Sequence, residues 1–216
     1  MTEKYRDDLK ALRTSVLDLG TLATDMLHNA MLALKNQDPD LAERVHAKKA
    51  ELADRNNDIE EQALKVIALY QPMAQDLRAI SCAIGMNDSL YRIGRFGKDI
   101  ANMVDGFAGA PHLANMMNLP HMADLVFSMI DDALKAYRYE DIAPLKDFTE
   151  RDDIVDNMRY SIFRESVTYM MEDPRSITRC IDYVMIARYL ERSGDHACDM
   201  AEKIYYMVTG ERQEIK

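Results

Sequence analysis

The segment Arg188-Tyr-Leu-Glu-Arg-Ser-Gly-Asp-His-Ala-Cys-Asp-Met-Ala-Glu202 indicates the fold, because parts of it repeat an earlier stretch of the chain. Three short motifs recur one hundred positions apart: Leu90-x-Arg92-x-Gly94 with Leu190-x-Arg192-x-Gly194, Asp99-x-Ala101 with Asp199-x-Ala201, and Ala33-Leu34-Lys35 with Ala133-Leu134-Lys135. Self-similarity at a fixed offset is typical of a duplicated structural unit. We therefore expect two copies of one unit.

Apolar residues in both halves recur at the spacing of buried helix faces. One line follows strict heptad spacing: Val45, Leu52, Ile59 and Val66. This periodicity predicts an all-α fold of two tandem three-helix bundle repeats, with six long helices. The expected helices cover residues 5–36, 38–70, 72–104, 120–138, 141–171 and 174–208.

Glycine, proline and asparagine interrupt the helical pattern near the middle of the chain. We expect a first repeat at residues 1–107, a linker at 108–119 and a second repeat at 120–216. Asp38-Pro39 and Asp173-Pro174 each place a capping acid before a proline, which predicts a helix start at both positions.

The composition limits the classes of function. The 216 residues carry 27 basic and 37 acidic side chains, for a net charge of −10, so we expect no nucleic-acid binding, which requires clustered Lys and Arg. Three cysteines without a CxxC motif favour a reducing compartment. No signal peptide is apparent, and no apolar run reaches the ~20 residues of a membrane span. We expect a cytoplasmic protein with no membrane span.

Acidic residues form a stripe along the last predicted helix. Glu191, Asp195, Asp199 and Glu202 stand at i, i+4, i+8 and i+11, with no Lys or Arg on that line. Like charges at i and i+4 disfavour a helix by roughly 0.2–0.5 kcal/mol per pair. The stripe therefore requires a positive partner: a basic side chain from another helix, a basic protein or a metal ion.

A second pair of acids, Asp152 and Asp156, stands at i and i+4 on the preceding helix. If the two helices pack side by side, these pairs face each other, and carboxylates suit Mg, Mn, Ca, Fe or Zn. The alternative is a solvated helix face, since the apolar line through Leu190 and Ala197 lies away from the acids.

The segments Ala187–Glu202 and Glu150–Asp156 closely resemble the signature motifs of the PhoU family. The first half is similar through Tyr70–Arg78 and Arg92–Gly94. The resemblance implies a cytoplasmic, all-helical regulator of phosphate uptake and of phosphate-starvation signalling, built from two three-helix repeats. It also implies contacts with the ATPase subunit of a phosphate ABC transporter and with a sensor histidine kinase, and a homodimer. Several members of the family bind multinuclear metal clusters.

The two repeats differ in how well they match the metal-binding positions of the family. In the second repeat five acids match the family motif, and we expect them to bind iron or zinc, with Mg, Mn and Ca as alternatives: Asp152, Asp156, Glu191, Asp195 and Asp199. Position 199 is commonly Asn in the family. In the first repeat the positions where the family has acids carry four other residues: Lys49, Ala53, Tyr91 and Arg95. Only Asp99 is retained there. We expect no metal in that repeat.

The leading hypothesis is a regulator that binds partner proteins and is not an enzyme. The alternatives are a metal-free helical scaffold or adaptor, whose acids contact a basic partner, and a metal-dependent hydrolase. His196 and Cys198 neighbour the acidic stripe, but a hydrogen bond and a buried packing role are the simpler interpretations. We find no anion-binding motif in the sequence.

Overall fold

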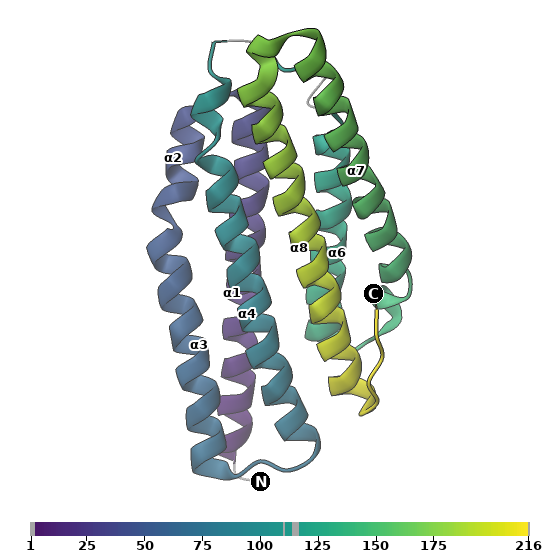
Figure 1. Cartoon of the computed structure of the whole chain (residues 1–216). Coiled ribbons are helices and arrows are strands. Elements are labelled where there is room, and N and C mark those ends of the chain that lie inside the picture. The colour runs from purple at the N-terminus through teal and green to yellow at the C-terminus, as the bar shows by residue number, and fades with distance from the viewer. Residues whose placement is uncertain (1–2, 110, 114–116, 216) are drawn as a thin grey trace.

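The computed structural model describes residues 3–109, 111–113 and 117–215. These residues form helices and connecting turns without a strand, which confirms the all-α prediction (Figure 1). The elements are α1 (Glu3–Asn36), α2 (Pro39–Ala47), α3 (Lys49–Tyr70), α4 (Gln75–Ala101), η1 (Val104–Phe107), α6 (Leu119–Tyr139), η2 (Ala143–Leu145), α7 (Phe148–Glu172), η3 (Pro174–Ser176) and α8 (Ile177–Thr209).

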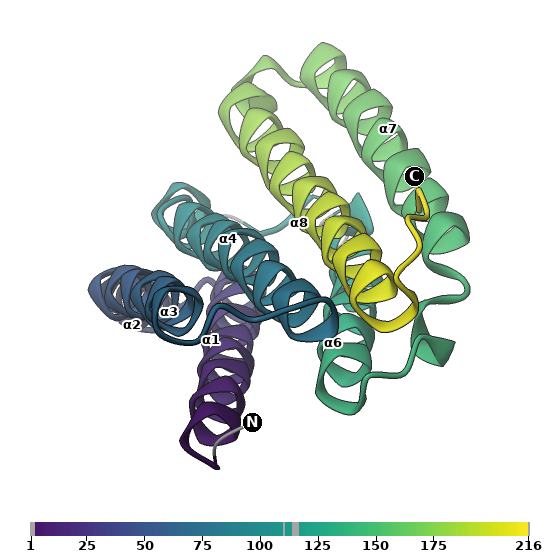
Figure 2. The ribbon, with the colours of Figure 1, turned by 90° about the horizontal axis from the view of Figure 1, so that it is seen from below.

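The helices form two three-helix units, as predicted. In the first unit α1 rises from the N-terminal end, α2 and α3 descend as one interrupted arm, and α4 rises again (Figure 1). In the second unit α6 descends, α7 rises and α8 descends (Figure 1). Viewed along the bundle, α4 and α8 lie side by side at the centre, with α3 beyond α4 and α7 beyond α8 (Figure 2).

The antiparallel packing of α4 against α8 joins the two repeats. Phe96 and His196 occupy equivalent positions in the two repeats, and their rings stack with centroids 5.9 Å apart. Phe96 also stacks on Tyr189 at 5.6 Å. The buried apolar side chains of both repeats belong to one continuous hydrophobic core. The two repeats therefore share one hydrophobic core.

Several helix ends differ from the sequence prediction. Asp38 caps α2 by accepting a hydrogen bond from the Leu41 amide at 2.9 Å, as expected, but the helix is interrupted at Lys48. Asp173 caps the short η3 turn, and α8 begins only after it. The α7 helix begins at Phe148 rather than near residue 141, because Pro144 lies in η2 and proline does not continue a helix from the preceding turn.

Part of the predicted linker is fixed against the bundle. Residues 110 and 114–116 of the expected linker lie outside the described residues. His112 Nε2 donates to the Leu34 carbonyl at 2.9 Å, which leaves Nδ1 to accept from the Tyr183 hydroxyl at 2.8 Å. This histidine therefore joins the end of α1 to α8. Within the described residues, no helix is both long and apolar enough to cross a membrane.

Candidate functional site: carboxylates between α7 and α8

Neighbouring helices bring together four of the five predicted site residues. Asp152 and Glu191 are each only 7% exposed, and they come from α7 and α8 respectively. Burial raises the pKa of Glu191, and the nearby Asp195 and Asp156 carboxylates raise it further. Gly194 on α8 faces Asp152, since a Cβ atom at this glycine would lie 3.7 Å from Asp152 Oδ1. The predicted juxtaposition of the two acidic pairs is therefore observed.

Two arginines bind the central carboxylate of this cluster. Arg188 Nη1 donates to both carboxylate oxygens of Glu191, at 2.7 and 2.9 Å. Arg159 of α7 places its Nε 3.4 Å from Glu191 Oε1. These cations lower the pKa of Glu191, yet its net shift is upward. Burial and the neighbouring acids therefore outweigh both arginines, so Glu191 holds its proton to a higher pH than a free glutamate does.

Asp199, the fifth predicted site residue, has His196 as its neighbour. Its side chain is exposed, and its Oδ2 lies 3.5 Å from His196 Nδ1. Burial lowers the pKa of His196, which Asp199 and Asp88 of α4 oppose. His196 thus faces the contact between α4 and α8. Cys198, the other neighbour of the stripe, is buried.

The cluster fits a metal ion in its chemistry but not in its present geometry. Carboxylate oxygens are suitable ligands for hard and borderline cations. Among the residues that the structure describes, however, no group of three or more His, Cys, Asp or Glu side chains converges as a metal site. Both oxygens of Glu191 are bound by Arg188. A metal ion at Glu191 would therefore compete with this arginine for the carboxylate oxygens.

The equivalent face of the first repeat has different chemistry. Arg95 donates to the Tyr91 hydroxyl at 3.1 Å, and the Arg95 guanidinium lies near the same aromatic ring. Asp99, the one acid retained from the family motif, pairs with Lys98 at 2.6 Å. Lys49 is exposed on α3. Basic side chains thus stand on this face, while the expectation that it binds no metal stays a prediction.

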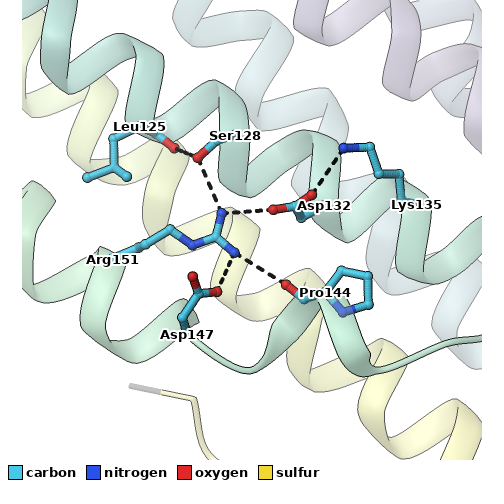
Figure 3. A network of polar contacts seen from close by, with 7 residues as sticks. All are labelled: Leu125, Ser128, Asp132, Lys135, Pro144, Asp147 and Arg151. Carbon is cyan, nitrogen blue, oxygen red and sulfur yellow. Dashed lines mark hydrogen bonds and ion pairs between the residues drawn. The ribbon is translucent and has the colours of Figure 1, made fainter.

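A structural residue that the sequence did not predict, Arg151, lies inside the acidic motif. Arg151 is largely buried and joins α6, η2 and the start of α7 (Figure 3). Its Nη1 donates to Asp132 at 2.9 Å and to Ser128 at 3.2 Å, and its Nη2 donates to Asp147 at 2.6 Å and to the Pro144 carbonyl at 3.3 Å. The only sequence signal is the i, i+4 pair with Asp147.

Both repeats match one protein family. Residues 16–104 and 119–204 match the family model described as "PhoU domain". The chain belongs to the PhoU family. The resemblance inferred from the signature motifs is therefore confirmed, and it extends over both repeats.

Similar proteins from other bacteria align with nearly the whole chain. The "Phosphate-specific transport system accessory protein PhoU homolog" of Rhizobium meliloti is 38% identical, over 95% of this chain and 87% of the relative. Its counterpart in Clostridium acetobutylicum is 31% identical over 100% and 99%. The crystal structure of PhoU from Pseudomonas aeruginosa superposes with a TM-score of 0.91 and 31% identity, over 96% of this chain and 100% of that one.

Proposed function

We propose that this chain is a cytoplasmic regulator of phosphate uptake and phosphate-starvation signalling, and that it acts by binding other proteins without catalysing a reaction. The observation that carries the proposal is the similarity of both repeats to accessory proteins of phosphate-specific transport. Its partners are the ATPase subunit of a phosphate ABC transporter and a sensor histidine kinase. The functional unit is a homodimer.

Exposed apolar side chains support a protein-binding role. Two stripes, which we call the α7–α8 apolar stripes, lie near the end where α7 passes into α8: Phe163, Val167 and Met171 on α7, and Ile177, Ile181 and Met185 on α8. Each stripe has spacing i, i+4, i+8, so its members share one helix face. Exposed apolar surface of this kind marks protein interfaces.

The α7–α8 carboxylates supply a second element of the proposal. Asp152, Asp156, Glu191 and Asp195 bind a metal ion, with iron or zinc preferred and Mg, Mn or Ca as alternatives. The nearness of the Asp156 and Asp195 carboxylates to Glu191 supports this assignment, because a cation reduces the repulsion among them. Asp199 contributes to the site from its exposed position beside His196. The bound ion supplies positive charge on the same two helices that carry the α7–α8 apolar stripes.

A metal-free adaptor is the second candidate, and one observation favours it. Arg188 and Arg159 already bind Glu191, so the cluster can remain folded without a metal ion. Quantifying the metal content of the purified chain separates the two candidates. Stoichiometric iron, zinc, Mg, Mn or Ca supports the metal-binding regulator, and the absence of all five supports the adaptor.

The protein-binding role is tested by co-purification with the transporter ATPase subunit and the sensor kinase of the same organism. The double variant Val167→Glu with Ile181→Glu should lose at least one of the two partners. A matched control, Leu64→Glu with Leu69→Glu, places the same charges at exposed positions of α3 and should keep both. Failure of the unaltered chain to bind either protein would contradict the proposal.

A further inference from the structure

A hollow of about 260 Å³ lies where the first repeat meets the second. It is bounded by α1, the start of α4 and the end of α6. Much of its lining is apolar, contributed by Leu9, Leu12, Ala79, Ile80 and Ala83. Concave sites with an apolar lining and a few polar groups are the usual form of small-molecule sites.

Three cations of α1 line this hollow. Arg6, Lys10 and Arg13 stand at i, i+4 and i+7, so they project from one face of the helix. Arg13 pairs with Glu140 at the end of α6. Arg6 and Lys10 are exposed and form no ion pair within the described part of the chain. Two positive charges without a protein partner are therefore available here, in a chain whose net charge is −10.

The acids at the hollow have partners of their own. Glu140 is paired with Arg13, and Asp76 Oδ2 accepts a hydrogen bond from the Tyr5 hydroxyl at 2.8 Å. Neither carboxylate is paired with Arg6 or Lys10. An incoming anion would therefore meet these cations without first having to displace an acid of the protein.

Tyr137 adds a neutral hydrogen-bonding group to the same hollow. It lines the hollow from α6, it is only 2% exposed, and Arg13 lies 5.9 Å from the centre of its ring. Its hydroxyl takes part in no hydrogen bond within the described residues. Burial raises the pKa of this phenol, so the hydroxyl keeps its proton and can donate it to a ligand. Buried hydroxyls normally have a partner.

We propose that this hollow binds a compact organic anion, whose phosphate or carboxylate group meets Arg6 and Lys10 and whose small apolar body packs on the apolar lining. The volume lies just below the range of roughly 300–1,000 Å³ for drug-sized ligands, which favours a small ligand. The ligand touches α1 of one repeat and α6 of the other, so it fastens the two repeats together. This site is independent of the transport role proposed above.

The test is isothermal titration of the full-length chain with four probes. Phenyl phosphate and benzoate carry the anion and the apolar body together, whereas inorganic phosphate carries only the anion and benzyl alcohol only the body. At least one of the first two should bind at least tenfold more tightly than both of the others, and its affinity should fall with added salt. Whichever binds identifies the preferred anionic group. Binding by neither, or equally tight binding of inorganic phosphate, would overturn the proposal.

Variants then locate the binding. The double variant Arg6→Gln with Lys10→Gln should lower the affinity for the bound probe at least tenfold. Tyr137→Phe should lower this affinity about threefold and leave the circular dichroism spectrum unchanged. The control Lys4→Gln with Lys65→Gln removes two exposed charges that do not line the hollow, and it should bind within twofold of the unaltered chain. Equal losses in the control and the hollow variant would show general charge attraction and refute the site.

Discussion

The Arg151 network gives a stability prediction that can be worked through in detail. Replacing Arg151 by Met keeps much of the side-chain bulk but removes its contacts with Ser128, Asp132, Pro144 and Asp147 (Figure 3). The arginine side chain is only 12% exposed, so water replaces these contacts poorly. We count about 1 kcal/mol for each of the three less exposed hydrogen bonds and little for the exposed Asp147 pair. The expected loss is about 2–4 kcal/mol.

Urea denaturation followed by circular dichroism measures this loss as a change in the free energy of unfolding. The matched control is Arg175→Met, which removes an arginine that is 91% exposed and pairs with Asp173. An exposed pair contributes only about 0–1 kcal/mol, so the control should stay close to the unaltered chain. A loss below about 1 kcal/mol for Arg151→Met, or one no larger than the control's, would refute the idea that this network fixes the start of α7.

Three further predictions follow from the packing and charge of the helices. Gly97→Ala should lower the melting temperature, with a loss of about 2 kcal/mol or more, because its Cβ would lie 2.7 Å from a backbone nitrogen of α1. The pKa of Glu191 in the folded state is raised above its ordinary value of 4.5. In the metal-free chain the unfolded state therefore loses this proton first as the pH rises above 4.5, and the folded state becomes less stable. Denaturation at stepped pH should therefore show Glu191→Gln gaining stability relative to the unaltered chain from that value upward, and a flat difference would contradict it. Asp156→Asn with Asp195→Asn should abolish bound metal and any metal-dependent rise in melting temperature, whereas Asp99→Asn should leave both nearly unchanged; metal retained by the double variant would count against the proposed site.

Most of the fold could be predicted because it depends on local periodicity. The recurring motifs around Gly94 and Gly194 revealed the duplication, and the heptad line through Leu52 and Ile59 revealed a buried helix face. Helix starts were less predictable where proline opened a short turn instead of a helix, as at Pro144 and Pro174. Propensity marks an interruption there but does not determine the turn that follows.

The candidate site was predictable only in part. Spacing placed Glu191 and Asp195 on one face, and the structure brings them to α7. Asp199 stands about two turns after Glu191 on the same stripe, but its carboxylate lies against His196, a contact that the spacing of the acids does not report. The contact between Arg159 and Glu191 depends on the register of two packed helices, which no local pattern reports. The hollow needs α1, α4 and α6 together, so no single stretch of sequence signals it.

The stacking of Phe96 on His196 has a consequence for the origin of the fold. Equivalent positions of two copies face each other only when an approximate two-fold axis passes between them, and here the axis lies between α4 and α8. A closed two-fold pair is the commonest arrangement of identical subunits. The tandem chain therefore has the architecture of a dimer of three-helix subunits joined in one chain. Because the halves of a single chain need not be identical, the acidic motif can stand in the second half where the first half has Lys49 and Arg95.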